Sequence, residues 1–349
     1  MKLLVKTFLI TGGAGFIGSN FAHYLYDRYP DYRILILDLL TYAGSLENLP
    51  GALSQGANNG RLQFWYGDVR NGQLVDSLVA QSDVVVHMAA ETHVTRSIYD
   101  NHHFFETDVL GTQVVANSVL KHVKQVDRFI HISTSEVYGT ARAPKMDEDA
   151  PLMPMSPYAS AKAGADRLVY SYFATYDLPA IIVRPFNQFG PRQHLEKVIP
   201  RFITSCLLDE PLRVHGDGSA ARDFTYVEDT CHALDCLTHC DLDRVRGEVI
   251  NLGSERSISL ADMAPLVARK MDRPDAAITY VGDRPGQVFR HTADASKAER
   301  LLGWRPRLSF EEGLERTIAW YTANRSWWEK QLWMRDIPII TKTGKRELH

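Results

Sequence analysis

The stretch "FLITGGAGFIG", residues 8 to 18, runs from a short apolar segment directly into three spaced glycines, Gly12, Gly15 and Gly18. Glycines at the point where a strand turns into a helix allow a tight turn and let backbone N–H groups approach a pyrophosphate. They also let the helix pack closely against the strand. The stretch therefore predicts a strand, a glycine-rich turn and a helix, the unit that opens a dinucleotide-binding fold.

The acidic residue Asp38 supports this interpretation. It ends the second apolar segment and follows Gly18 by about 20 residues, the place where a carboxylate binds the ribose hydroxyls of a dinucleotide. A carboxylate there repels a 2′-phosphate, so the pattern favours NAD over NADP. Asp68, at the end of the third segment, either contacts the adenine or caps the following turn. The expected cofactor residues here are Gly12, Gly15, Phe16, Ile17, Gly18, Asp38, Asp68, Val69 and Ala89.

Apolar segments recur along the first half of the chain, separated by stretches of helix length. They are nearly continuous in Val, Ile, Leu and Phe, which is typical of strands buried on both faces of a parallel sheet. The expected strands are residues 8–12, 33–38, 61–68, 83–90, 128–134 and 179–185; the expected helices are Phe16 to Tyr29, Gly72 to Ala80, Phe104 to His122 and Tyr158 to Tyr176. This alternation predicts an α/β fold with a Rossmann-type doubly wound parallel sheet.

The pattern changes past about residue 190, where Pro, Gly, cationic and aromatic residues interrupt the periodicity. A chain of 349 residues also exceeds one ordinary core. We therefore expect an NAD-binding domain over residues 1–190 and a smaller C-terminal α/β domain that binds the substrate over residues 191–330. A tail follows over residues 331–349, and parts of residues 222–255 could return to the first domain.

The bulk composition narrows the partners and the compartment. A net charge of −3 offers no electrostatic case for nucleic acid, and no apolar run approaches the length of a membrane span. The first residues, "MKLLVKTFLITGG", are expected to form a strand, not a signal peptide. Four cysteines in a long chain favour a reducing compartment without disulfides, hence the cytoplasm. His232, Cys236 and either His239 or Cys240 have a spacing that could hold zinc, but Cys commonly packs inward, and we expect no metal.

A second pattern places two reactive groups on one helix. In "SPYASAKAGADRL", Tyr158 and Lys162 are four residues apart and hence share a helix face. A phenol ordinarily loses its proton near pH 10, and a neighbouring ammonium stabilises the phenolate and lowers that pKa. The fifth expected strand ends in Thr134, Ser135 and Glu136. Because such groups are costly to desolvate, they either cap the next loop or face a substrate.

Further motifs follow these two in order. They are "LDLLTYAGSLENL", "AAETHVTRSI", "STSEVYG", "RPFNQFGPRQHLEKVIP", "GDGSAARDFTYVEDTCHAL" and "DRPGQVFRHTAD". With them the chain resembles the extended short-chain dehydrogenase/reductase family, and within it the nucleoside-diphosphate-sugar 4,6-dehydratases, over residues 7 to 328. Among these it looks most like the dTDP-glucose enzymes, which carry an Asp where this chain has Ser135. The order Thr-Ser-Glu resembles GDP-mannose 4,6-dehydratase and UDP-glucuronate decarboxylase.

The resemblance implies a function. Tyr158, supported by Lys162 and Thr134, would take the proton of the sugar O4 while C4 gives hydride to NAD, so Tyr158 and Lys162 also belong to the cofactor site. Glu136 would take the C5 proton, a hydroxyl would leave C6 near Ser135, and hydride would return to C6. Nucleotide-sugar 4-epimerases and UDP-glucuronate decarboxylases share most of the motifs and remain alternatives. A nucleotide-sensing regulator on an inactive fold is a distant one.

The same resemblance implies the substrate site and the assembly. The residues that would hold the nucleoside-diphosphate sugar are His93, Arg96, Asn187, Lys197, Arg222, Asn251, Arg284 and His291. Cations suit a pyrophosphate, whereas His93 could equally be structural. The helices at Phe104 to His122 and Tyr158 to Tyr176 resemble those of the family's dimer interface, so we expect a homodimer. In the C-terminal segment 324–349, Trp327, Trp328 and Trp333 are expected to dock against the body of the protein; a partner chain or a membrane surface is the alternative.

Overall fold

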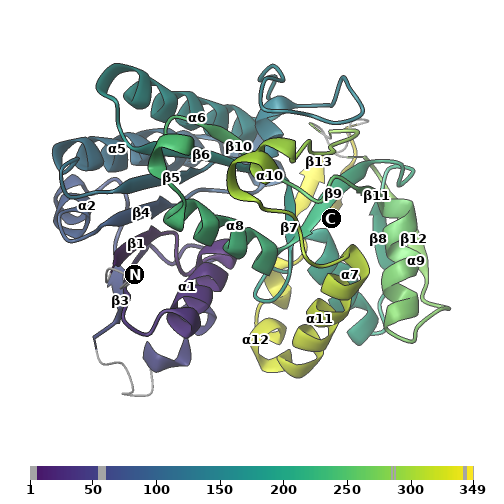
Figure 1. Cartoon of the computed structure of the whole chain (residues 1–349). Coiled ribbons are helices and arrows are strands. Elements are labelled where there is room, and N and C mark those ends of the chain that lie inside the picture. Colours follow the sequence, from purple (N-terminus) through teal and green to yellow (C-terminus); the bar gives the residue numbers. More distant parts are fainter. Residues whose placement is uncertain (1–5, 54–59, 284–285, 287, 341–343, 349) are drawn as a thin grey trace.

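A seven-stranded parallel sheet forms the centre of the larger lobe (Figure 1). The computed structural model describes residues 6–53, 60–283, 286, 288–340 and 344–348. In spatial order the strands are β10 (Val249–Leu252), β6 (Ala180–Pro185), β5 (Arg128–Ile132), β4 (Val84–His87), β1 (Thr7–Thr11), β2 (Arg33–Asp38) and β3 (Leu62–Tyr66). Every residue of β1, β4, β5 and β6 is buried, which explains their continuous apolar sequences. The strand order reverses between β1 and β4, and such a crevice is where doubly wound sheets bind ligands.

Helices cover both faces of this sheet. One face packs against α1 (Phe16–Arg28), α8 (Val227–His239) and α10 (Ser296–Leu302), and the other against α2 (Gly72–Val79), α5 (Thr112–Lys121) and α6 (Pro157–Tyr176). Three described segments from the second half of the chain, α8, β10 and α10, thus belong to the larger lobe. The predicted doubly wound α/β fold is confirmed.

The smaller lobe lies beside the carboxyl ends of the sheet. It contains a three-stranded sheet of β11 (Ser257–Ser259), β9 (Ala221–Tyr226) and β7 (Asn187–Phe189), and a pair formed by β12 (Ile278–Val281) and β8 (Leu212–His215). Around them pack α7 (Val198–Leu207), α9 (Leu260–Lys270), α11 (Phe310–Ala323) and α12 (Arg325–Glu329). The chain ends in a hairpin of β13 (Pro338–Ile340) and β14 (Arg346–Leu348). Two short helices, α3 (Val94–Tyr99) and α4 (His102–Phe104), follow β4.

The predicted helix at Phe104 to His122 has a different interior. Residues Phe105–Gly111 form a π-helical stretch between α4 and α5. Thr112 Oγ1 donates a hydrogen bond to the carbonyl of Asp108 (2.5 Å), and the Asp108 carboxyl turns inward to accept from the Glu91 N–H (2.8 Å). Wide turns of this kind are frequent at functional sites, and here the stretch carries a buried acid toward the sheet.

Two tryptophans of α12 dock the C-terminal segment 324–349 against the protein. Trp327 and Trp328 are buried, as predicted, whereas Trp333 is 79% exposed. Trp327 Nε1 donates to Asn48 Oδ1 (2.9 Å), and Asn48 Nδ2 donates to the carbonyl of Ala14 in the glycine-rich turn (2.8 Å). The contact joins the end of the smaller lobe to the first turn of the larger one.

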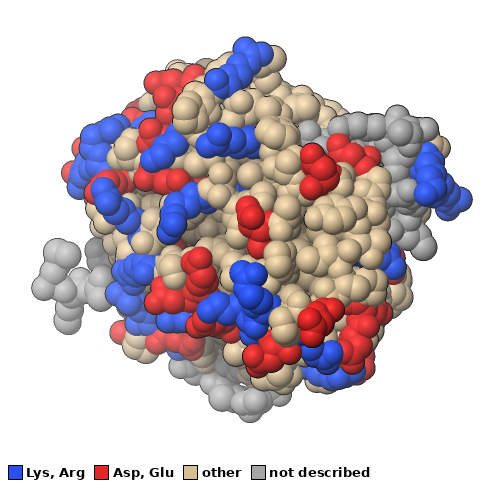
Figure 2. Space-filling view, turned by 90° about the vertical axis from the view of Figure 1, so that its right-hand side faces the viewer, with Lys and Arg blue, Asp and Glu red and all other residues tan. Residues whose placement is uncertain are grey.

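The surface carries charges of both signs. In Figure 2, Lys and Arg are interspersed with Asp and Glu on one side of the face, and an area without charged residues extends toward the other. No described helix is long and apolar enough to span a bilayer.

Candidate active site

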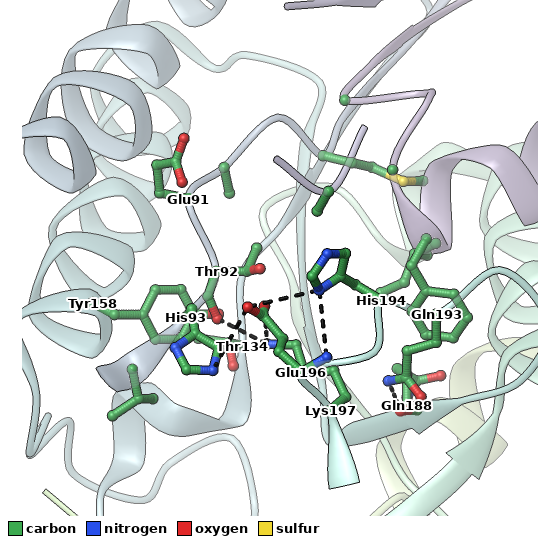
Figure 3. Close-up of a pocket in the computed structure, with 18 of the residues that line it drawn as sticks. Glu91, Thr92, His93, Thr134, Tyr158, Gln188, Gln193, His194, Glu196 and Lys197 are labelled. Atoms are coloured by element: carbon green, nitrogen blue, oxygen red, sulfur yellow. Dashed lines mark hydrogen bonds and ion pairs between the residues drawn. The ribbon is translucent and has the colours of Figure 1, made fainter. Parts of the chain in front are cut away.

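A cavity of about 450 Å³ lies where the carboxyl ends of β1, β4, β5 and β6 meet the smaller lobe (Figure 3). The glycine-rich turn follows β1, Ala89 follows β4, Thr134 follows β5 and Asn187 follows β6, and all of them line it. The smaller lobe supplies the opposite wall from α7, β8 and β9. The cavity thus joins both sites that the sequence predicted.

The glycine-rich turn fits a dinucleotide. Gly12 has φ of +69°, and a Cβ there would lie 2.6 Å from the backbone nitrogen of Ala89. A Cβ at Gly18 would lie 2.4 Å from the Gly12 carbonyl. Side chains are therefore excluded from the turn, which leaves backbone N–H groups to face a pyrophosphate. All predicted cofactor residues line the cavity, including Phe16, Ile17 and Val69.

Asp38 and Asp68 line the cavity at the end next to the glycine-rich turn. The Asp38 carboxylate accepts hydrogen bonds from the N–H groups of Ala14 (2.9 Å) and Leu40 (2.8 Å), so it ties the glycine-rich turn to the loop after β2. Burial raises the pKa of Asp38, although these two bonds oppose the rise. Asp68 Oδ1 accepts from the Arg70 N–H (2.8 Å) and therefore caps the following turn, while the residue also lines the cavity.

The three polar residues after β5 both cap the next turn and face the cavity, the two roles that the sequence left open. Thr134 Oγ1 accepts from the Glu136 N–H (3.2 Å) and caps the short helix Ser135–Tyr138. Thr134, Ser135 and Glu136 also line the cavity. Tyr158 stands beside Thr134 (Figure 3), and the Thr134 hydroxyl hydrogen-bonds the phenol. Tyr158 is held there because Ser156 caps α6, accepting from the Ala159 N–H (3.1 Å).

Lys162 is buried behind Tyr158. Its Nζ donates to the carbonyl of Ile132 (2.7 Å) at the end of β5. Burial lowers the pKa of Lys162, while the charges of Asp108 and Asp166 raise it. Burial likewise raises the pKa of Asp108, so the π-helical stretch places a second titrating group at the site.

The expected fall in the pKa of Tyr158 does not occur in the protein alone. Burial, followed by the charge of Asp108, raises it, and the hydrogen bond from Thr134 only partly opposes the rise. Burial is the largest cause, and the charges of Asp108 and Glu136 add to it.

A histidine stands behind Ser135. His291 is completely buried, and its Nε2 donates to the carbonyl of Gly139 (2.6 Å). Its Nδ1 is therefore the acceptor, and it receives the Ser135 hydroxyl (3.4 Å). Glu136 Oε1 lies 3.9 Å from the same nitrogen. Burial lowers the pKa of His291, although Glu136 raises it, so the ring is neutral near pH 7. His291 supports the cavity wall through Ser135.

The structure brings only part of the predicted substrate set to the cavity. His93, Asn187, Lys197 and Arg222 line it. Asn251 is fully buried away from it, where Nδ2 donates to the Met146 carbonyl (3.0 Å) and Oδ1 accepts from Tyr138 (2.8 Å). Arg96 approaches through its contact with Glu196. Arg284 lies outside the described residues.

Glu196 is the residue that sequence reasoning missed. Its carboxylate is almost completely buried in the cavity wall, where it accepts a hydrogen bond from Tyr42 (3.2 Å). Four cationic or imidazole groups surround it: His93 at 3.9 Å, Arg96 at 3.4 Å, His194 at 3.7 Å and Lys197 at 3.6 Å. Figure 3 shows His93, His194 and Lys197 around the carboxylate. Burial alone would raise the pKa of Glu196, but these groups outweigh it and lower the pKa to about 2. In the sequence, "HLEK" places this acid between a histidine and a lysine, a pattern equally typical of an exposed carboxylate.

The candidate zinc spacing on α8 has other partners. Cys236 Sγ lies 3.6 Å from His232 Nε2, and Cys240 contacts Arg128. Within the described parts of the chain, no group of three or more His, Cys, Asp or Glu residues is placed to hold a metal ion.

Comparison with known proteins places this geometry in a family. Residues 9–317 match the model of the GDP-mannose 4,6-dehydratase family. The chain is 47% identical to the low-salt glycan biosynthesis protein Agl12 of Haloferax volcanii, over 90% of this chain and 97% of that one. It is 40% identical to dTDP-glucose 4,6-dehydratase of Streptomyces antibioticus, over 92% of this chain and 94% of that one.

Solved structures agree. DesIV, a dTDP-glucose 4,6-dehydratase from Streptomyces venezuelae solved with NAD bound, superposes with a TM-score of 0.86 at 38% identity, over 93% of this chain and 99% of that chain. A UDP-glucuronic acid 4-epimerase from Bacillus cereus, solved with UDP-glucuronic acid and NAD, gives 0.84 at 31% identity, over 91% and 99%. The chain therefore belongs to the nucleoside-diphosphate-sugar 4,6-dehydratase group of the extended short-chain dehydrogenase/reductase family.

Proposed function

We propose that the protein is an NAD-dependent nucleoside-diphosphate-sugar 4,6-dehydratase. The observation that carries this proposal is the single cavity shared by the glycine-rich turn, the pair Thr134 and Tyr158, and the carboxylate of Glu136. An enzyme that only oxidises a sugar needs the first two. A carboxylate beside the phenol adds a group that can move a proton at a neighbouring carbon.

The residues divide the chemistry among them. The glycine-rich turn and Asp38 would hold NAD, which would supply the reversible hydride acceptor for C4 and C6 of the sugar. Tyr158 takes the proton from the O4 hydroxyl, held in place by its hydrogen bond with Thr134. Lys162 fixes the end of β5 against α6 and adds its charge to the site. Once C4 is a ketone, Glu136 takes the proton from C5.

Ser135 fits the departure of the C6 hydroxyl as a positioning group. Its own proton is directed to Nδ1 of His291, so its lone pairs are left to accept a hydrogen bond in the cavity. Glu136, protonated by C5, then gives a proton to the leaving oxygen. The C5–H and C6–O bonds break, a C5–C6 double bond forms, and one water leaves. Hydride then returns to C6, and C5 takes up a proton that Glu136 would relay from solvent.

A second candidate is nucleotide-sugar 4-epimerase, favoured by the close superposition with the Bacillus cereus epimerase. Mass spectrometry of a panel of nucleotide sugars incubated with the protein separates the candidates. A dehydratase product loses the mass of one water, an epimerase product keeps its mass, and a decarboxylase product loses the mass of carbon dioxide. Turnover in deuterium oxide should label C5 of a dehydratase product. Unlabelled product, or an unchanged panel, would contradict the proposal.

We propose further that the protein is a cytoplasmic homodimer. Large apolar side chains lie exposed on the π-helical stretch and α6, among them Phe105, Leu110, Tyr170 and Tyr176. Such side chains are typical of a surface that a second copy covers. Light scattering after size-exclusion chromatography should give twice the chain mass, and Tyr176→Lys should shift it toward one.

A further inference from the structure

The C-terminal segment Arg335–Ile337 reaches the same cavity from beyond the residues that the family model matches. In Figure 1 the yellow end of the chain returns from α12 to the middle of the molecule. Ile337 is buried and lines the cavity. The family match ends at residue 317, so this wall is supplied by a part of the chain outside it.

Ion pairs fix the segment to the smaller lobe. Asp336 pairs with Arg201 of α7 and lies 3.5 Å from Arg213 of β8, and both arginines line the cavity. Arg201 Nη1 also donates to the carbonyl of Arg335 (2.7 Å), and Arg335 pairs with Glu210. Arg201 is 7% exposed. A buried guanidinium needs a partner, and the tail supplies it.

The position of this wall follows from the chemistry. The cofactor pyrophosphate belongs at the glycine-rich turn, and the reacting sugar belongs beside Tyr158. The nucleoside diphosphate must then extend away from both, into the smaller lobe. That end combines Arg222 and Arg213 with apolar side chains: Val198, Phe202, Ala220, Leu260 and Ile337. Cations suit a diphosphate, and an apolar slot suits a nucleobase.

We propose that Arg335–Ile337 forms the outer wall of the nucleoside site and determines which nucleobase it accepts. Ile337 packs against the base, while Asp336 holds Arg201 and Arg213 in place. This inference rests on the proposed function, because it assigns one part of the substrate's site.

Graded variants of Ile337 test the wall in NAD-loaded protein. Isothermal titration with UDP, dTDP and GDP, each separately, identifies the base that the wild type binds best, and inorganic pyrophosphate serves as a probe without a nucleoside. Ile337→Ala should weaken that nucleotide by roughly 15- to 60-fold, as loss of two or three buried carbon groups predicts. Ile337→Val should have a smaller effect, and pyrophosphate binding should stay unchanged. Trp333→Ala, on the exposed side of the same tail, is the control.

The outcomes are distinct. The proposed wall would be contradicted if both Ile337 variants kept the nucleotide affinity, the NAD content and the melting temperature of the wild type. A wild type that binds none of the three nucleotides would overturn the proposed function and the wall together. If Ile337→Ala fails to fold, Ile337→Val decides alone.

Discussion

Replacing Glu196 by glutamine tests how strongly its neighbours hold a buried charge. Glutamine keeps the shape of the side chain and an oxygen for the Tyr42 hydroxyl, but removes the charge that faces Arg96 and Lys197. The carboxylate pKa falls from its ordinary 4.5 to about 2 in the folded protein. Because each pKa unit corresponds to about 1.4 kcal/mol, the environment stabilises the charged form by about 3 kcal/mol.

The pH dependence has a definite sign. The pKa of Glu196 is depressed on folding, so its contribution to stability is fully present above pH 4.5 and is lost as the pH falls to about 2. At neutral pH, Glu196→Gln should therefore lower the free energy of unfolding by about 3 kcal/mol. For a chain of this length that corresponds to a melting temperature lower by about 4 °C. The gap to the wild type should narrow at about pH 3.5 and close near pH 2.

Differential scanning calorimetry of the variant and the wild type, at neutral pH and at about pH 3.5, provides the measurement. Glu329→Gln is the matched control, because Glu329 pairs with Arg325 on the exposed surface of α12 and should change the stability by less than about 1 kcal/mol. The reasoning fails if Glu196→Gln melts with the wild type at neutral pH. It fails equally if the melting temperatures of the variant and the wild type differ by the same amount at neutral pH and at about pH 3.5, since the charge of Glu196 would then not be the source of the difference.

Three further changes have equally direct readouts. Tyr158→Phe should lower turnover by roughly 10² to 10⁴-fold while NAD content, read from absorbance after denaturation, stays that of the wild type; comparable turnover would refute the role of the phenol. Gly12→Ala should yield protein without NAD, because the new methyl group would meet Ala89 N at 2.6 Å from a backbone with φ of +69°; retained NAD would contradict this. In the wild type, Arg184 donates to both carboxylate oxygens of Asp166 (2.8 and 2.9 Å). Asp166→Asn leaves this buried guanidinium without its charge partner, so urea titration should show a free energy of unfolding lower by about 3–5 kcal/mol. A loss below about 1 kcal/mol would show that water replaces the pair.

The sheet and the cofactor turn could be predicted because their causes are local. Strands buried on both faces need continuous apolar sequence, and a turn that excludes Cβ atoms needs glycine, so β1, β2, β4, β5, β6 and Gly12 are visible in the chain itself. Tyr158 and Lys162 are visible for the same reason, since their spacing alone puts them on one helix face.

The rest depends on contacts between distant residues. Glu196 has the sequence signature of a surface acid and becomes a buried one only because His93 and Arg96, some hundred positions away, fold against it. The π-helical turn at Asp108 depends on a backbone N–H from another loop, that of Glu91. The family resemblance assigns Asn251 to the substrate, yet the bonds to Tyr138 and Met146 hold it inside the lobe. None of these partners is set by local periodicity.

The indole of Trp327 bonded to Asn48, with Asn48 bonded in turn to Ala14, fastens the last helix of the chain to the mouth of the dinucleotide crevice. The two lobes cannot swing apart without breaking that clasp. A dinucleotide that is reduced and reoxidised within one catalytic cycle has no reason to depart between cycles, and the clasp makes departure slow. Extended dialysis should leave the bound dinucleotide behind, and it should come away readily only once the clasp is cut by Trp327→Phe.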